Sequence, residues 1–299
     1  MLGNLLSFAL MSLIWGVTWA AVKLGLQELP PLFLAAMRYL STAIVLSVAL
    51  GGGAWAKMRG QSVRLVGSAI LVNVGTYGLL FWGMQSVPSG LSGVVNLALV
   101  PVLLFSLAAF TGEERLTSTH AVALALGSLG LVGLFWTRLH QGGTGSGLGL
   151  AAIVAATACY CIGSVVGRPL VGVTRPLAMT MMQAAIGGPV LLLLSFITEP
   201  VSASTFSALG SPRAVGSILF LSMLGTIVGY TIYLMLLREW GMVRAGLYAF
   251  VSPIVALAVG AGLFGETVGP AEIGGAVLLM SAAALVLGKN RRAQVGADV

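Results

Sequence analysis

Residues 101–113 read PVLLFSLAAFTGE, and residues 253–266 read PIVALAVGAGLFGE. Both stretches run from a proline through small and apolar residues to a Gly-Glu pair. A tyrosine stands well before each proline, at Tyr77 and Tyr230, and the spacing of the whole pattern agrees within one residue. Self-similarity of this kind indicates that the second half of the chain repeats the first.

The composition is that of a membrane protein. Of the 299 residues, 58% are hydrophobic and 8% are charged, whereas an ordinary soluble domain has about 25% charged residues. This excludes a soluble globular protein and a disordered chain, and long apolar runs exclude a porin-type barrel, whose strands alternate apolar and polar residues. The net charge of +7 would suit nucleic acid in a soluble protein. Here the basic residues cluster between hydrophobic runs, so we expect contact with membrane lipid and no nucleic acid partner.

Ten hydrophobic runs are each close to the ~20 residues that a helix needs to cross a bilayer. They predict an all-α integral membrane protein with ten transmembrane helices. The runs are residues 4–26, 31–50, 63–85, 89–110, 118–136, 148–167, 175–196, 214–237, 243–264 and 269–288.

The lysines and arginines predict the orientation. If the amino terminus lies inside, the segments predicted inside hold eleven of these residues, those predicted outside hold three, and the remaining one, Arg38, lies within the second run. Because positive charge stays cytoplasmic, we expect a multi-pass protein of a bacterial-type inner (plasma) membrane with both termini in the cytoplasm.

The repeat divides the runs into two groups of five. We expect a first five-helix repeat at 1–141, a glycine-rich connection at 142–147, a second repeat at 148–288 and a basic cytoplasmic tail at 289–299. Since five is odd, the second repeat must enter the membrane from the opposite side. Such inverted repeats around a central cavity are the usual framework of alternating-access transporters.

Several of these residues resemble one transporter family. The first run contains Trp15 and Gly16, the fourth and ninth runs each contain a proline, and a Gly-Glu pair follows each of those two runs. These features are similar to those of the EamA type of the drug/metabolite transporter superfamily. The resemblance covers nearly the whole chain, and overall the sequence is most similar to the YddG-like exporters of aromatic amino acids. It implies a basket of helices around a central cavity, with the fifth and tenth spans at the periphery.

Polar and aromatic side chains within the runs form stripes along single helix faces. In lipid such side chains should face the protein interior or a wet cavity. One interpretation is a substrate site for an amphipathic metabolite with a ring or an aliphatic side chain. The other is packing, because Trp and Tyr also form interfacial belts and small polar residues also form helix contacts. The candidate substrate-binding residues are Trp15, Trp19, Arg38, Asn73, Tyr77, Asn96, Tyr160, Gln183, Tyr230, Tyr248 and Ser252.

Arg38 is the strongest single candidate for a substrate-binding residue. It falls roughly two turns into the second run, where a cation costs at least ~2.5 kcal/mol. It could bind a substrate carboxylate, or it could extend toward the interface and bind backbone carbonyls. Pro31-Leu32 and Arg38 match Pro176-Leu177 and Gln183 weakly, and because Gln183 is uncharged the predicted site is asymmetric.

The acids and the helix prolines indicate how transport would work. All eight acids stand near the ends of runs or in loops, whereas proton-coupled pumps usually place a carboxylate or histidine deep in the membrane. We therefore expect facilitated transport down the substrate gradient. Pro101 and Pro253 are candidate hinges, with static shape as the alternative. Glu113 and Glu266 are candidate gates, with loop anchoring as the alternative.

Together these patterns predict an exporter of small amphipathic metabolites that works by alternating access. The main expected substrates are amino acids with aromatic or apolar side chains. The alternative within the class is a broader drug or metabolite exporter, with ion coupling open. A membrane enzyme is disfavoured because no deep acid, histidine or metal-ligand cluster occurs, and a scaffold is disfavoured by the repeat. We expect a small-molecule substrate, no cofactor, no metal and no obligate protein partner.

Overall fold

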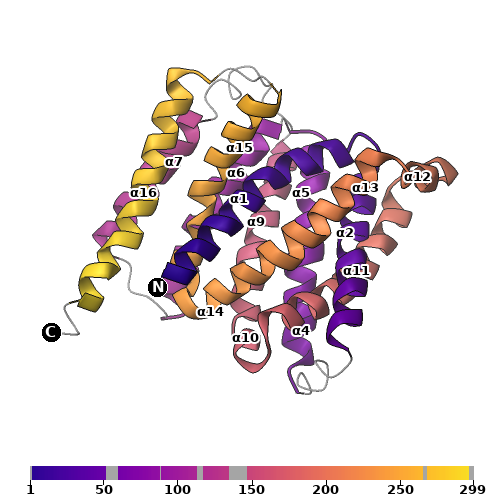
Figure 1. Ribbon diagram of the computed structural model, residues 1–299, viewed down its shortest axis with the longest axis horizontal. Helices are drawn as coiled ribbons and strands as arrows, with labels where there is room; N and C mark the ends of the chain where they lie inside the picture. Colours follow the sequence, from indigo (N-terminus) through magenta and orange to yellow (C-terminus); the bar gives the residue numbers. More distant parts are fainter. Residues whose placement is uncertain are drawn as a thin grey trace.

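The computed structural model describes residues 2–51, 60–87, 89–112, 117–134, 147–264 and 268–295. All regular secondary structure within these residues is helical, and the helices pack side by side as one bundle (Figure 1). The prediction of an all-α protein is confirmed for this part of the chain. The helices are α1 (Leu2–Gly25), α2 (Pro31–Leu50), α4 (Ser62–Ala69), η1 (Ile70–Gly75), α5 (Thr76–Met84), α6 (Ser89–Phe110), α7 (Ser118–Leu134), α9 (Gly147–Gly167), α10 (Leu170–Val173), α11 (Pro176–Thr198), α12 (Ala203–Ala208), α13 (Pro212–Leu219), η2 (Phe220–Tyr230), α14 (Thr231–Gly246), α15 (Tyr248–Phe264) and α16 (Pro270–Val295).

Six helical stretches in the described residues are long and apolar enough to cross a membrane. Four shorter apolar helices accompany them, at Val95–Phe110, Ser118–Gly133, Tyr248–Val259 and Pro270–Val286. All of these lie within or close to the predicted hydrophobic runs. The six longer stretches are Gly3–Val22, Pro31–Leu50, Ser62–Met84, Gly147–Val173, Pro176–Thr198 and Pro212–Gly246.

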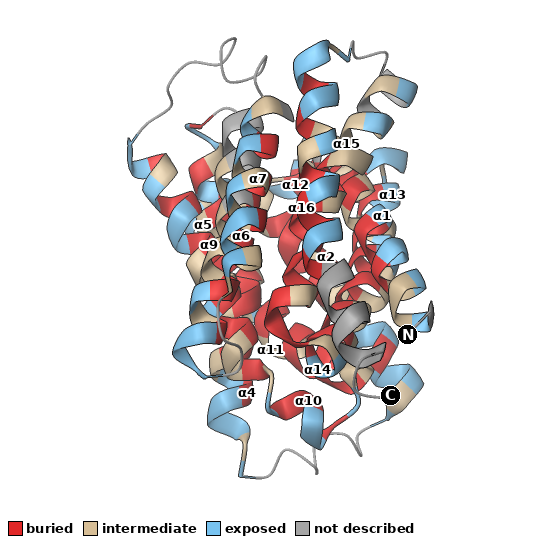
Figure 2. Ribbon diagram, turned by 90° about the vertical axis from the view of Figure 1, so that its left-hand side faces the viewer, coloured by how far each residue is buried: buried red, intermediate tan, exposed pale blue. Residues whose placement is uncertain are grey.

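Burial follows the pattern of a protein in lipid. Buried residues fill the centre of the bundle, and exposed residues lie on its outer surface (Figure 2). Many of the exposed side chains are large and apolar, such as Val48, Val63, Phe110 and Ile197. Apolar side chains on an outer surface of this extent are stable against hydrocarbon but would not be stable in water.

Two of the long stretches contain π-helical segments, η1 and η2, which the sequence did not predict. At the end of η1 and within η2, a threonine hydroxyl donates to the carbonyl oxygen five residues earlier, Thr76 to Leu71 at 3.0 Å and Thr226 to Leu221 at 2.9 Å. A π segment widens the helix and is frequent at functional sites. Both segments lie deep in the bundle, and both contribute residues to the site described below.

The turn between the eighth and ninth predicted runs is tighter than expected. Helix α14 continues past residue 237, reverses direction at Gly241 with φ 80° and ψ 175°, and resumes helical geometry at once. Glycine is required there because a side chain strongly disfavours positive φ. Two short helices, α10 and α12, were also not predicted, and α16 continues to Val295, into the predicted basic tail.

Helices α7 and α16 pack against each other at one edge of the bundle (Figure 1). A Cβ atom on Gly130 would lie 2.9 Å from the carbonyl oxygen of Gly275, and one on Gly127 would lie 2.3 Å from the ring of Phe250. These glycines therefore permit close helix approach, as small residues do in membrane helix contacts. The edge position agrees with the expectation that the fifth and tenth spans are peripheral.

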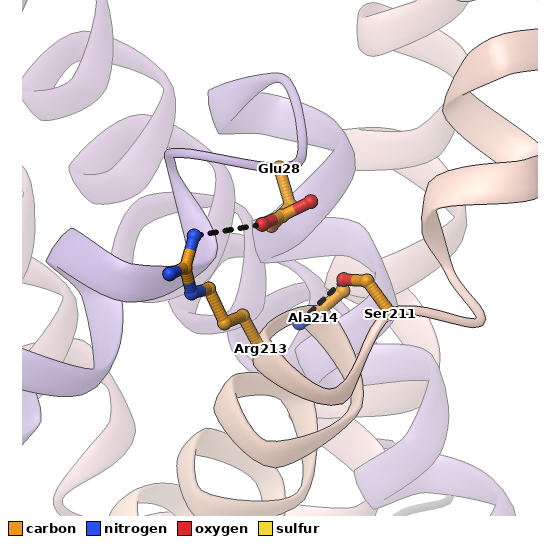
Figure 3. A network of polar contacts seen from close by, with 4 residues as sticks. All are labelled: Glu28, Ser211, Arg213 and Ala214. Carbon is orange, nitrogen blue, oxygen red and sulfur yellow. Dashed lines mark hydrogen bonds and ion pairs between the residues drawn. The ribbon is translucent and has the colours of Figure 1, made fainter.

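At one end of the bundle, the carboxylate of Glu199 accepts hydrogen bonds from the backbone N–H groups of Leu32 at 2.7 Å and Phe33 at 3.0 Å. It therefore caps the start of α2, where these groups have no helical partner. Nearby, Arg213 and Glu28 form an ion pair at 3.5 Å, and the side chain of Ser211 caps α13 by accepting from the N–H of Ala214 (Figure 3).

We expect Glu199→Ala to lower the free energy of unfolding by about 1–2 kcal/mol, because it removes a charged helix cap and leaves two N–H groups without an acceptor. Glu28→Ala should change stability by less than ~1 kcal/mol, since its ion pair with the exposed Arg213 is screened by solvent. Thermal unfolding of both variants in detergent measures the difference. Equal melting temperatures would contradict the capping role of Glu199.

Candidate functional site

A cavity lies in the middle of the bundle, and its wall is formed by residues of α1, α2, η1, α5, α6, α9, η2 and α15. Its volume is about 130 Å³, which is room for on the order of ten water-sized groups. The wall is mostly apolar and aromatic, as in small-molecule sites. Eight of the predicted binding residues line it: Trp15, Arg38, Tyr77, Asn96, Tyr160, Tyr230, Tyr248 and Ser252.

Arg38 is held in the cavity wall by two hydrogen bonds. Its Nε donates to Thr226 Oγ1 at 2.7 Å, and its Nη1 donates to the hydroxyl of Tyr77 at 3.1 Å. The guanidinium carbon lies 5.0 Å from the ring centroid of Tyr77 and 5.3 Å from that of Tyr39, within range of cation–π attraction. The side chain is 5% exposed. These two bonds use two of the five donors of a guanidinium, so the fork retains capacity to bind an acceptor in the cavity.

Gln183, which the weak sequence match pairs with Arg38, lies in α11. Its Oε1 accepts from the hydroxyl of Tyr230 at 2.8 Å, and its backbone carbonyl accepts from Asn73 Nδ2 at 2.8 Å. Arg38 therefore contacts Tyr77 in its own half and Thr226 in the other half, while Gln183 contacts Tyr230 in its own half and Asn73 in the other. The two tyrosine contacts are alike, but Thr226 bonds the charged side chain of Arg38, whereas Asn73 bonds the backbone carbonyl of the uncharged Gln183.

Gln183 and Asn73 do not line the cavity, although the sequence placed them with the other candidates. They are 1% exposed and pair with each other and with their neighbours, and Gln183 Nε2 also donates to Ser68 Oγ at 2.6 Å. A buried amide without a partner would be costly, and here the Asn73 amide bonds the Gln183 backbone while the Gln183 amide bonds Ser68 and Tyr230. They support the wall from behind.

A cluster of aromatic rings closes one side of the cavity around Tyr233, which is fully buried. The Tyr233 ring lies 5.6–6.0 Å, centroid to centroid, from four other rings. Its hydroxyl donates to Ser164 Oγ at 3.1 Å. These four rings are Trp15, Tyr160, Tyr230 and Tyr248, and all four also line the cavity. The cluster therefore joins helices of both halves of the chain at the cavity wall.

Three further polar side chains of the wall bind neighbouring helices. Trp15 Nε1 donates to the carbonyl oxygen of Gly225 at 3.0 Å, and Asn96 Nδ2 donates to Thr157 Oγ1 at 2.9 Å. Ser252 Oγ donates to the carbonyl oxygen of Ser12 at 3.1 Å. The Asn96 side chain keeps its Oδ1 acceptor and its second N–H for other contacts.

The remaining predicted residues are placed as follows. Pro101 lies inside α6 and Pro253 inside α15, each directly after a cavity-lining residue. The side chain of Trp19, and all of Glu113 and Glu266, lie outside the described residues. Sequence reasoning did not select Thr18, Tyr39 and Thr76, which also line the cavity. Tyr39 follows Arg38 directly, and adjacent positions on a helix do not share a face, so no stripe marked it.

The wall carries a single kind of charge. Arg38 is the one ionisable cation among the described lining residues, and no aspartate or glutamate accompanies it there. In low-dielectric surroundings a buried cation without an acidic partner strongly favours an anionic or hydrogen-bond-accepting ligand.

Comparison with known protein families identifies the group to which the chain belongs. A model of the EamA-like transporter family matches residues 2–136 and 147–288. The chain belongs to the EamA-like transporter family. The prediction of an EamA-type transporter is thereby confirmed.

Curated EamA relatives match along most of their length. The chain is 29% identical over 292 residues to an uncharacterized inner membrane transporter, YedA, of Escherichia coli (strain K12), covering 93% of this chain and 88% of YedA. It is 28% identical over 277 residues to a probable amino-acid metabolite efflux pump of Salmonella typhimurium (strain LT2), covering 91% of this chain and 90% of the pump. A solved crystal structure superposes with a TM-score of 0.79 at 18% identity, covering 97% of this chain and 98% of that one. This likeness supports the fold of the EamA chain.

Proposed function

We propose that this EamA protein exports small amphipathic metabolites by alternating access through the central cavity. The main proposed substrates are amino acids with aromatic or apolar side chains. The observation that carries the proposal is the cavity itself, an aromatic and apolar wall with one buried guanidinium. The rings and aliphatic groups would contact the substrate's side chain, and the guanidinium of Arg38 would bind its carboxylate.

The relatives support the choice of cargo. One is named as an amino-acid metabolite efflux pump and another as an inner membrane transporter. We therefore place this chain in a bacterial-type inner membrane, with a small molecule as substrate.

We further propose ten spans in two inverted repeats, at 1–141 and 148–288, joined by residues 142–147 and followed by a basic tail at 289–299. Several observations support this topology. The tyrosine contacts of Arg38 and Gln183 are alike in the two halves. The π-helical segments η1 and η2 occur in the third helix of each proposed repeat, and α2 and α11 both begin with a proline. Residues 2–136 and 147–288 match the family model separately.

The proposed orientation places both termini in the cytoplasm. The distribution of lysine and arginine supports it, and α1 begins at the same end of the bundle at which α16 ends (Figure 1). In this orientation the capping contact of Glu199 with α2 lies at the outer surface.

Alternating access would require the two groups of helices to move around the cavity. Pro101 and Pro253 remain proposed hinges, because each removes a backbone hydrogen bond beside a lining residue. Glu113 and Glu266 remain proposed gate residues at opposite membrane faces. The aromatic cluster around Tyr233 joins both halves and would have to separate for the cavity to open on that side.

A broader exporter of drugs or other metabolites is the second candidate. The rest of the cavity wall favours this candidate. Its apolar groups and neutral hydrogen-bond donors discriminate weakly between substrates that differ outside the carboxylate.

The test is uptake of labelled Phe, Trp, Thr and Leu into liposomes that contain the purified protein, without any ion gradient. We expect saturable uptake of Phe and Trp. We expect Tyr77→Phe to reduce kcat/KM by about two- to tenfold, because the ring is kept while the hydroxyl bound to Arg38 is lost. No uptake of any of the four amino acids would contradict the proposed cargo. Steady uphill uptake driven by a pH gradient alone would contradict facilitated transport.

A further inference from the structure

The charge of the cavity is unbalanced. Arginine stays protonated in proteins, so Arg38 places a permanent positive charge in the wall. The described acids are engaged elsewhere and do not reach it. Glu28 pairs with Arg213, Glu199 caps α2, Glu239 accepts from Asn4 Nδ2 at 2.7 Å, and Glu272 accepts from the N–H of Gly269 at 3.0 Å.

The other four acids of the chain stand at or beyond the ends of the hydrophobic runs in the sequence. They are Glu113, Glu114, Glu266 and Asp298. No acid of the chain therefore falls in the middle of a run, at the depth where the sequence places Arg38.

We propose that the cavity carries its substrate as a monovalent anion, a small carboxylate with an aromatic or apolar body, so that each export event moves one negative charge across the membrane. This inference rests on the proposed function and narrows its substrate class. It predicts that a carboxylate without an ammonium group is a better substrate than the corresponding amino acid.

A bound monoanion and a bound zwitterion leave the site with different net charges. A monoanion on Arg38 forms a neutral pair and adds no second charge. A zwitterion leaves the site with a net positive charge, and its ammonium group finds only neutral partners in the described wall, such as Asn96 Oδ1 and the tyrosine rings. Because unpaired charge is costly in a low-dielectric site, the monoanion is the better-matched ligand. Two aromatic faces near Arg38, those of Tyr39 and Tyr77, already interact with the guanidinium.

Charge movement follows from the transport cycle. A uniporter returns empty to its starting state, so the net charge moved per cycle is that of the substrate. In a cell with a negative interior, the membrane potential then favours export of an anion. A potential of about 100 mV corresponds to a roughly 50-fold concentration ratio of a monovalent ion. Export against a concentration gradient would then need no titratable carboxylate in the membrane.

The experiment records electrical current from liposomes that contain the purified protein, after rapid addition of phenyllactate or Phe. The two compounds share the same carbon skeleton and carboxylate, and phenyllactate has a hydroxyl in place of the ammonium group of Phe. Passive leak of the neutral acid moves no charge, so it does not contribute to the current. We expect a saturable current from phenyllactate with the sign of anion entry, and no current from Phe at the same concentration.

Two variants serve as the matched pair. Arg38→Gln should reduce the phenyllactate current at least about tenfold. Arg213→Gln removes an arginine that is 64% exposed and is not among the described lining residues of the cavity, and it should leave the current unchanged. An imposed inside-positive potential should raise phenyllactate uptake, whereas Phe uptake should not respond.

The outcomes separate this inference from the proposed function. Saturable Phe uptake with no phenyllactate current would overturn the anion proposal and leave the exporter of amino acids standing. A phenyllactate current that persists in Arg38→Gln would also overturn it. Absence of both Phe uptake and phenyllactate current would contradict the inference and the proposed function together.

Discussion

Arg38→Gln is expected to lower kcat/KM for a carboxylate substrate by about 10- to 100-fold, because a hydrogen bond to a charged group in a buried site contributes ~1.5–3 kcal/mol. Glutamine is the informative replacement here. Gln183, which the weak sequence match pairs with Arg38, bonds the hydroxyl of Tyr230. A glutamine at position 38 can therefore bond the hydroxyl of Tyr77 and fill the wall while removing the charge.

Folding and transport should separate in this variant. Removing a buried charge that has no acidic partner among the described residues should leave the melting temperature unchanged or raise it. Arg38→Lys keeps the charge but loses the planar fork, so its kcat/KM should lie between those of wild type and Arg38→Gln. The exposed Arg213→Gln serves as the arginine control. Unchanged kcat/KM in correctly inserted Arg38→Gln would contradict a role of Arg38 in binding.

Gly16→Ala is expected to destabilise the protein by about 1–3 kcal/mol, and Gly16→Val by more. A Cβ atom at Gly16 would lie 2.5 Å from Val255 Cβ and 2.8 Å from the carbonyl oxygen of Ser252. Since one of these neighbours is backbone, α1 and α15 would have to move apart. Trp15 and Ser252 line the cavity on these two helices, so the shift should also impair transport.

Gly78→Ala is the matched control for this substitution. A Cβ atom there would meet nothing within 4 Å, and alanine is the better helix former. Thermal unfolding in detergent should therefore place Gly78→Ala at or above wild type and Gly16→Ala several degrees below it. Equal melting temperatures for the two variants would show that the contact between α1 and α15 does not need glycine.

Much of the fold could be predicted because lipid imposes a simple rule on sequence. A chain that must bury every backbone polar group in hydrocarbon forms long apolar helices, and such runs are visible by eye. The π-helical segments η1 and η2 were not visible, because the step from i−4 to i−5 bonding depends on packing around Thr76 and Thr226. The reversal at Gly241 was hidden because a single glycine within an apolar stretch has many possible roles.

The site was predicted in its outline and missed in its details. Deep aromatic residues such as Tyr77 and Tyr230 line the cavity together with Arg38. A stripe on one helix does not say whether a polar side chain faces a cavity or a neighbouring helix, and Asn73 and Gln183 face a neighbouring helix. Which partner each amide finds is set by the packing of η1 against α11, and that packing cannot be read from one helix at a time.

The proposed transport depends on a bond between Arg38 and the carboxylate of a substrate inside the cavity. The most direct test measures how strongly phenyllactate and its neutral amide inhibit uptake of labelled Phe, in wild type and in Arg38→Gln. The pairing of one ligand change with one protein change isolates the interaction between them. We predict that wild type prefers phenyllactate over the amide by at least about tenfold and that Arg38→Gln loses this preference. The same preference in both proteins would contradict the bond between Arg38 and the carboxylate.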